Sequence, residues 1–194
     1  MKIGLDFDNT IVCYDNAIRI LSKELNLPLS LNKSKIEIRD YLRIQDRETE
    51  WTKFQGELYG PGINFANLYE NCKETIKKLN NNQHELFIIS HKTKYPYEGV
   101  QYNLHKFANN WIEKNISQDI IKKNKIYFLE TLDEKINIIN LLQIDIFIDD
   151  LPEVINHINF PKYTKGIIFD PDKKFITYHN RITNWGEIFN YGIK

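Results

Sequence analysis

Two aspartates follow the first hydrophobic run of the chain. The segment "KIGLDFDNTIV", residues 2–12, places Asp6 and Asp8 directly after an apolar stretch, with one residue between them. Carboxylates this close repel each other, and burying either one is costly unless a cation or a proton compensates its charge. The spacing therefore indicates a site whose chemistry depends on a bound positive charge.

Polar residues also end two other hydrophobic runs. The run "ELFIIS", residues 85–90, ends in Ser90, and "DIFIDD", residues 145–150, ends in Asp149 and Asp150. If both runs are strands that lie beside the first one, a hydroxyl and three carboxylates converge at one edge of a sheet. Mg²⁺ prefers oxygen ligands, and a site with few carboxylates and several waters suits it.

The order of strands and helices must bring these residues together. Five short apolar runs, rich in Ile and Phe, are typical of strands buried on both faces of a parallel sheet. They are "KIGLDF" (2–7), "ELFIIS" (85–90), "KIYFL" (125–129), "DIFIDD" (145–150) and "KGIIFD" (165–170). Amphipathic helical patterns lie between them. This alternation predicts an α/β fold, a Rossmann-like doubly wound parallel sheet with right-handed crossovers.

Residues 15–60 interrupt the alternation, because they contain helical patterns and no candidate strand. We predict three helices here: one from Asp15 to near Pro28, one from Ser34 with Glu37 completing a capping box, and one that carries Trp51, Phe54 and Leu58 and stops at "GPG" (60–62). The predicted domains are an α/β core of residues 1–14 and 61–194 and a small helical cap of residues 15–60. Ligands bind at the carboxyl ends of strands in such sheets, where we expect the cap to lie.

Four motifs in this order make the chain similar to the haloacid dehalogenase superfamily of phosphotransferases, over nearly its whole length. The motifs are "LDFDNT" with Asp6, Asp8 and Thr10, "LFIIS" with Ser90, "TLDEKINIINLL" with Lys135, and "IFIDD" with Asp149 and Asp150. A lone D-x-D spacing is a weak signal. Four motifs on the expected elements make a strong one.

The resemblance implies a role for each motif residue. Asp6 is the expected nucleophile, which attacks phosphorus and forms an aspartyl-phosphate. Asp8 is the expected general acid and base. The implied cofactor is Mg²⁺, held by the Asp6 carboxylate, the Asp8 backbone carbonyl and Asp149. Ser90 and Lys135 are expected to bind the phosphoryl oxygens of the substrate.

The presence of Asp8 bears on the reaction. Hydrolysis of a carbon–halogen bond needs no acid for its leaving group, and the dehalogenases of the superfamily lack an aspartate at this position. Asp8 therefore indicates a phosphatase that hydrolyses a small phosphomonoester: a sugar phosphate, an amino-alcohol phosphate or a nucleoside monophosphate. Phosphomutases keep both aspartates and remain an alternative. A non-catalytic phosphate-binding or scaffolding protein with the same fold is the other alternative.

For several other candidate residues, the sequence allows either a role in the site or a purely structural role. Thr10 either supports the site or caps the turn that follows it. Asp150 and Glu153 either orient a water on the metal or cap the helix that begins at Pro152. The following residues are candidates for substrate binding or specificity, with a surface role as the alternative: His91, Lys92, Tyr95 and Tyr97 after Ser90, and Arg39, Arg43 and Arg47 in the cap.

Composition excludes several classes of protein. The 194 residues have a formal net charge of zero and no basic block, so general nucleic-acid binding is not expected. The two cysteines, Cys13 and Cys72, are too few for a disulfide framework. We find no signal peptide and no apolar run long enough to cross a membrane. The sequence therefore predicts a cytoplasmic protein with a small-molecule partner.

Overall fold

A computed structural model describes residues 1–28 and 34–193. Its contacts divide the chain into two compact units. The first unit comprises Met1–Val12, Leu68–Lys92 and Ile116–Lys194, and the second comprises Cys13–Asn67 and Thr93–Asn115. At the boundary, two short strands pair with each other, β2 (Val12–Cys13) and β3 (Asn67–Leu68).

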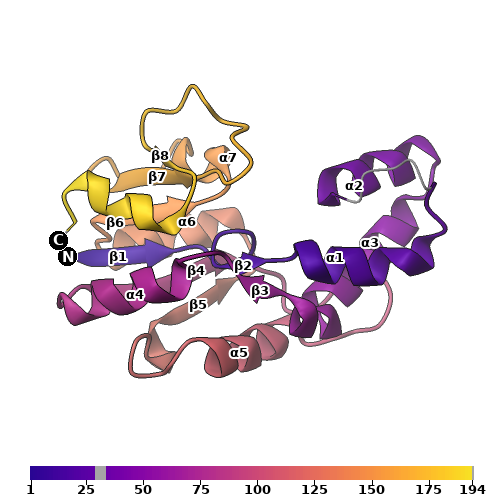
Figure 1. The fold of residues 1–194 in the computed structure, drawn as a ribbon, viewed down its shortest axis with the longest axis horizontal. Helices are drawn as coiled ribbons and strands as arrows, with labels where there is room; N and C mark the ends of the chain where they lie inside the picture. The colour runs from indigo at the N-terminus through magenta and orange to yellow at the C-terminus, as the bar shows by residue number, and fades with distance from the viewer. Residues whose placement is uncertain (29–33, 194) are drawn as a thin grey trace. The chain divides into compact units, whose positions relative to one another are not determined.

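The first unit contains a six-stranded sheet in which every pair of neighbouring strands runs parallel. The strand order is β5 (Ile126–Leu129), β4 (Glu85–His91), β1 (Lys2–Leu5), β6 (Ile146–Asp149), β7 (Lys165–Phe169) and β8 (Arg181–Ile182) (Figure 1). The predicted Rossmann-like α/β sheet is confirmed, and the five predicted strands are present with ends shifted by at most two residues. β8 was not predicted, because two residues are too few to show a period.

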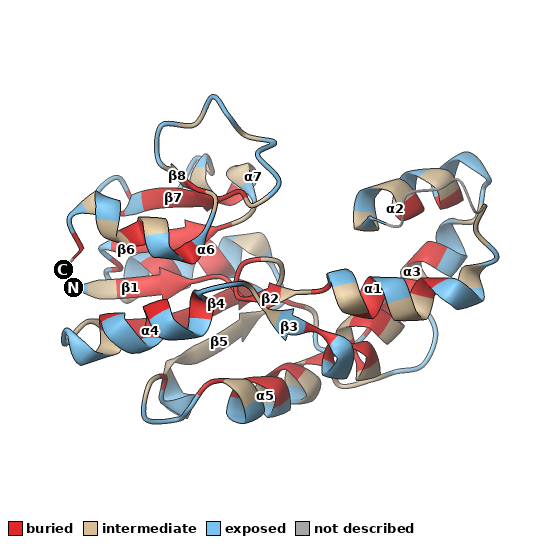
Figure 2. Ribbon diagram, viewed as in Figure 1, coloured by how far each residue is buried: buried red, intermediate tan, exposed pale blue. Residues whose placement is uncertain are grey.

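Burial on both faces explains why these strands are continuously apolar. β1, β6 and β7 are largely buried (Figure 2). The side chains of Phe87, Ile89 and Phe147 form one core cluster with Ile136 and Ile139 of α6 (Leu132–Leu141). In Figure 1, α4 (Cys72–Asn81) lies in front of the sheet and α6 lies behind it. A sheet covered in this way leaves its strand ends as the place where polar side chains reach solvent.

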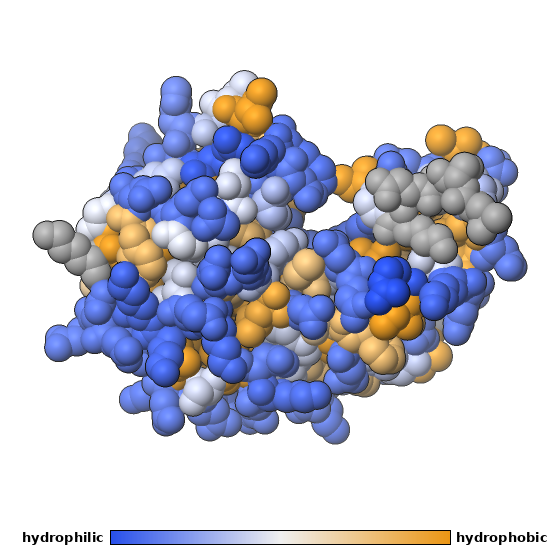
Figure 3. Space-filling view, viewed as in Figure 1, coloured by the Kyte–Doolittle hydropathy of each residue, from blue (hydrophilic) through white to orange (hydrophobic). Residues whose placement is uncertain are grey.

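Three shorter elements complete the first unit. They are the 3₁₀ turn η3 (Lys123–Lys125), the helix α7 (Pro152–Ile155) and the 3₁₀ segment η4 (Trp185–Tyr191). Figure 3 shows hydrophilic residues over most of the visible surface of this unit, with hydrophobic ones in small separate groups. Within the part of the chain that the structure describes, every helix is too short or too polar to cross a membrane.

The second unit is helical. It contains α1 (Asp15–Leu21), η1 (Ser22–Leu25), α2 (Lys35–Ile44), α3 (Glu48–Tyr59), η2 (Pro61–Phe65) and α5 (Leu104–Asn115). Ser34 caps α2 by accepting a hydrogen bond from the Glu37 amide, and its hydroxyl donates to the Glu37 carboxylate. The first predicted helix is α1 continued by η1, and it ends at Leu25, where Asn26 follows in a left-handed conformation with φ of 48°. Residues 29–33 of the predicted cap lie outside the described residues.

The loop after β4 packs against α3 within the second unit. A Cβ on Gly56 would lie 3.0 Å from the Pro96 ring, and one on Gly60 would lie 2.9 Å from the Tyr102 ring. The Tyr102 hydroxyl also donates to the Glu57 carboxylate at 3.0 Å. Glycine therefore permits a close approach that a larger side chain would block. This packing explains why Thr93–Asn115 groups with the helices of residues 13–67.

Asp170 anchors the connection between β7 and β8. Its carboxylate accepts hydrogen bonds from the amides of Lys174 and Phe175, both at 2.8 Å, and from the Arg181 guanidinium at 3.0 Å. Burial alone would raise the pKa of this carboxyl, but the two amides and the guanidinium outweigh burial and lower the pKa. The ionised form of Asp170 is therefore the one that stabilises the fold.

We expect Asp170→Asn to lower the free energy of unfolding by about 1–3 kcal/mol at neutral pH, because hydrogen bonds to a charged group are lost. A carboxyl with a lowered pKa stabilises the protein above its unfolded pKa of about 4 and loses that contribution as the pH falls through the folded value. Urea unfolding at neutral pH and below about pH 4 measures this difference. A loss of equal size at both pH values would contradict the assignment, and Asp172→Asn in the same loop is the control.

Candidate active site

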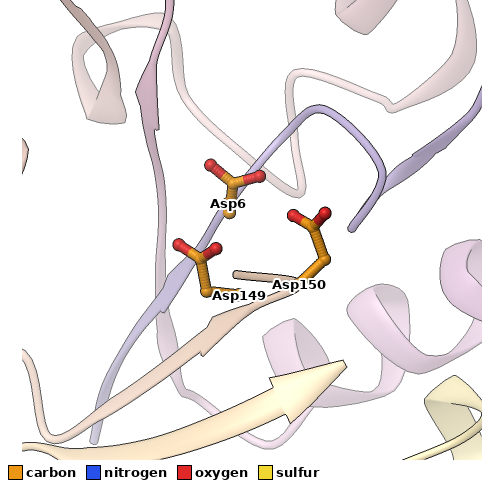
Figure 4. A group of neighbouring side chains, drawn as sticks. All are labelled: Asp6, Asp149 and Asp150. Atoms are coloured by element: carbon orange, nitrogen blue, oxygen red, sulfur yellow. The ribbon is translucent and has the colours of Figure 1, made fainter. Parts of the chain in front are cut away.

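Three carboxylates gather where β1 and β6 end. The backbone amide of Asp6 donates to the Ile148 carbonyl at 2.9 Å, which fixes the end of β1 beside β6. β6 ends in Asp149, and Asp150 follows it. One carboxylate oxygen from each of these three aspartates lies within 4.8 Å of the others. Figure 4 shows the three carboxylate groups gathered at these strand ends. β1 lies between β4 and β6 in the sheet, so the condition that the sequence left open, that these strands are neighbours, is met.

Lys135 joins two of these carboxylates. Its ammonium donates to Asp6 Oδ1 and to Asp149 Oδ2, each at 2.6 Å, and its side chain is only 2% exposed. Lys135 lies on α6, whose first turn is held by a complete capping box between Thr131 and Glu134. A lysine on the helix that precedes β6 therefore reaches the ends of both β1 and β6, and its role in binding phosphate stays a prediction.

The charges of this buried group do not balance. Burial alone would lower the pKa of Lys135, but the Asp149 and Asp6 carboxylates outweigh burial and raise the pKa, so the ammonium stays charged. For Asp149, burial and the charge of Asp6 raise the pKa, although the Lys135 ammonium opposes them. One ammonium thus serves two buried carboxylates, with Asp150 nearby. An all-oxygen site with excess negative charge fits a hard divalent cation.

Asp8 lies on the turn that leaves β1. Its Oδ2 accepts a hydrogen bond from the Lys92 ammonium at 2.7 Å, and the Lys92 side chain is 3% exposed. The turn itself depends on Asn9, whose φ of 61° is in the left-handed region that asparagine tolerates better than most residues. Asp8 and Lys92, both candidate site residues from the sequence, therefore form an ion pair with each other.

Thr10 contacts Asp150 in two ways. Its hydroxyl donates to Asp150 Oδ1 at 3.2 Å and accepts from the Asp150 amide at 3.1 Å. The Thr10 carbonyl accepts a hydrogen bond from the Trp185 indole at 3.1 Å. From the sequence, Thr10 could either support the site or cap a turn. In the structure its hydroxyl contacts Asp150, which belongs to the group of three carboxylates. The paired acids of "IFIDD" were the only sign in the sequence that Asp150 joins this group.

Ser90 and His91 end β4, which lies between β1 and β5. Ser90 is 1% exposed and in register with Phe128 of β5. His91 is exposed, and its ring Nε2 donates to the Glu130 carbonyl at 3.1 Å. Successive residues of a strand point to opposite faces, so the two side chains diverge. The substrate-binding roles predicted for both residues stay predictions.

The arginines predicted as specificity candidates form ion pairs within the second unit. Arg39 pairs with Asp40, Arg43 with Glu48, and Arg47 with Glu50, at distances of 2.8, 2.6 and 2.6 Å. Such surface pairs contribute little to stability. Tyr95 and Tyr97 are exposed, at 45% and 81%, and Glu153 is exposed in α7.

Two bacterial relatives span nearly the whole chain. A protein of Oceanobacillus iheyensis named "Putative nucleotidase" is 24% identical over 195 residues, which cover 95% of each chain. A Bacillus cereus protein with the same name is 24% identical over 207 residues, which cover 97% of this chain and 96% of the relative. No family model matches the chain.

Solved structures of haloacid dehalogenase-like hydrolases superpose on the chain over almost its full length. One from Streptococcus pneumoniae has a TM-score of 0.67 at 15% identity and covers 98% of this chain and 97% of its own. One from Bacillus subtilis, bound to magnesium, has a TM-score of 0.59 at 13% identity with the same coverage. The strand order, the four motifs and these superpositions agree: the chain has the fold of the haloacid dehalogenase superfamily.

Proposed function

We propose that the protein is a Mg²⁺-dependent phosphatase that hydrolyses a small phosphomonoester through an aspartyl-phosphate. One observation carries the proposal: the buried carboxylate of Asp6 lies 2.6 Å from the Lys135 ammonium and next to Asp149 and Asp150. A carboxylate at the open end of a strand can reach a substrate, and the ammonium beside it can neutralise a phosphoryl group. The names of the two relatives and the fold of the structural neighbours support the same reaction class.

The chain's own residues account for two steps. In the first, an oxygen of Asp6 forms a bond to phosphorus while the bond to the leaving oxygen breaks, and Asp8 gives that oxygen a proton. In the second, Asp8 removes a proton from a water that attacks phosphorus, and the bond to Asp6 breaks to release phosphate. Lys135 and Ser90 bind the non-transferred phosphoryl oxygens in both steps.

The residues that would hold the metal are the Asp6 carboxylate, the Asp8 backbone carbonyl and Asp149. Asp150 lies close enough to contribute as well. When bound, Mg²⁺ shields the carboxylate of the nucleophile from a dianionic phosphate and draws charge from a phosphoryl oxygen. Thr10 would then orient Asp150 through the hydrogen bonds described above.

Among the predicted substrates, a nucleoside monophosphate has the support of the two relatives named as nucleotidases. Sugar phosphates and amino-alcohol phosphates are the other substrates to test. We also propose that the helices of residues 15–60 form the cap of this enzyme, since caps exclude water and complete such sites. The loop of residues 93–103 packs on α3, so residues beyond 60 also contribute to the helical unit.

We expect phosphate release from p-nitrophenyl phosphate to require Mg²⁺, to stop in excess chelator, and to be supported less well by Zn²⁺, because the site offers only oxygen ligands. The assay is then repeated with a panel of nucleoside, sugar and amino-alcohol phosphates. Full activity in excess chelator would overturn the metal requirement. Phosphate binding without turnover would favour a non-catalytic protein, and transfer of phosphate within one substrate would indicate a mutase.

A further inference from the structure

Lys92 is a buried cation that the reaction above does not use. It is the first residue after β4, and its amide donates to the Leu129 carbonyl at 2.8 Å, which holds its backbone against β5. Its side chain is 3% exposed, and its ammonium lies 2.7 Å from Asp8 Oδ2. The same ammonium lies 5.8 Å from the centre of the Phe7 ring, the residue between the two catalytic aspartates. Lys92 is therefore fixed at both its backbone and its charged end.

A buried ammonium is costly unless it stays paired. If Lys92 bound the substrate's phosphate directly, it would have to weaken its contact with Asp8 during each turnover. Lys135 already places one ammonium next to Asp6, where the phosphoryl group must arrive. Asp8, by contrast, lies on a turn in which the next residue, Asn9, has a left-handed conformation, and the Asp8 side chain is 17% exposed. A partly exposed carboxylate on a turn needs a fixed partner to keep one orientation.

We infer that Lys92 is a positioning residue for Asp8: it donates to Oδ2, which accepts a hydrogen bond in both protonation states of the carboxyl group, and so holds that group with Oδ1 facing the leaving oxygen. This inference rests on the proposed function, and it assigns to Lys92 a role other than phosphate binding. In the first step Oδ1 delivers its proton to the leaving oxygen as the bond between that oxygen and phosphorus breaks. In the second step the same atom receives the proton of the attacking water. Lys92 contributes no proton and forms no bond in either step.

The test compares the rates of phosphoenzyme formation from two substrates. The substrates are p-nitrophenyl phosphate, whose leaving group departs without a proton, and the alkyl phosphate with the highest turnover in the panel above. We expect Lys92→Met to slow the alkyl substrate by up to roughly 10²-fold, because a misplaced catalytic group costs about that much. The aryl substrate should lose far less, and inhibition by inorganic phosphate should be unchanged. Lys92→Arg keeps a donor and should restore part of the selective loss.

A double-mutant comparison adds a second readout. In an Asp8→Asn background, Lys92→Met should cause no further selective loss, since the residue that it positions is already disabled. The control is Lys125→Met, which removes the ion pair of Lys125 with Glu85 (3.0 Å) at the other end of β4. It should leave the ratio of the two rates unchanged, and thermal unfolding checks that each variant folds.

Three outcomes would overturn the inference. An equal loss for both substrates with weaker phosphate inhibition would make Lys92 a direct phosphate ligand. A selective loss that persists in the Asp8→Asn background would show that Lys92 acts independently of Asp8. An unchanged ratio of the two rates in a folded Lys92→Met variant would show that Lys92 does not position Asp8. Turnover by the unmodified protein tests the proposed function separately, so the two failures are distinguishable.

Discussion

Asp6→Asn is expected to abolish phosphoenzyme formation with every substrate. The amide cannot attack phosphorus, and the site would also lose one of the carboxylates proposed to hold the metal. Removing the nucleophile of a covalent enzyme can cost on the order of 10⁶-fold in kcat, so activity should fall to the background of the assay. The measurement is acid-quench trapping of labelled phosphate on the protein, alongside steady-state phosphate release.

Asp145→Asn is the matched control for this substitution. Asp145 is an exposed aspartate immediately before β6, at the opposite end of that strand from Asp149, and its carboxylate accepts a hydrogen bond from the Lys2 amide at 2.7 Å. It should keep full activity. A phosphoenzyme that still forms in Asp6→Asn would show that another residue is the nucleophile, and the mechanism would have to be replaced.

Lys135→Met is expected to have the largest effect on stability. The substitution leaves the buried carboxylates of Asp6 and Asp149 without the ammonium that lies 2.6 Å from each. Breaking a buried ion pair from one side typically costs about 3–5 kcal/mol in the free energy of unfolding. Urea unfolding of the metal-free protein at neutral pH measures this loss. Phosphate turnover should fall as well, because the substrate loses a positive partner.

The pH dependence of that loss follows from its cause. Burial raises the pKa of Asp149 against the opposing charge of Lys135, so without Lys135 the folded state takes up a proton on Asp149 at a higher pH than the unfolded state does. The stability difference from the unmodified protein should therefore be largest at neutral pH and shrink at about pH 5. Saturating Mg²⁺ should also reduce it, since the ion supplies positive charge.

Lys77→Met, at an exposed position of α4, is the control and should change stability little. If Lys135→Met destabilised the protein no more than this control does, the buried ion pairs would not be a major contribution to the fold. A loss that grew on acidification would contradict the linkage argument, because protonation should relieve the uncompensated charge.

The α/β class of the fold and five strands of its parallel sheet could be predicted from the sequence alone. Strands such as β1 and β6 are buried on both faces, so their residues form continuous apolar runs that stand out from amphipathic helices such as α6. The polar residues that end these runs indicated a shared site on the condition that the strands are neighbours, because carboxylates gather where a cation can be held. Lys135, fourteen residues before Asp149, was assigned through the resemblance to the superfamily and not through a local pattern.

The pairing of side chains that are distant in the sequence depends on the tertiary structure. Lys92 and Asp8 are 84 positions apart, and Thr10 and Asp150 are 140 positions apart. Nothing in their local patterns distinguished a substrate ligand from a positioning residue. The same holds for residues 93–115, which follow a strand of one unit but pack with the helices of the other. Periodicity in the sequence indicates which residues of a helix or strand are buried. It does not indicate which distant elements pack together, or which buried charges then need a partner.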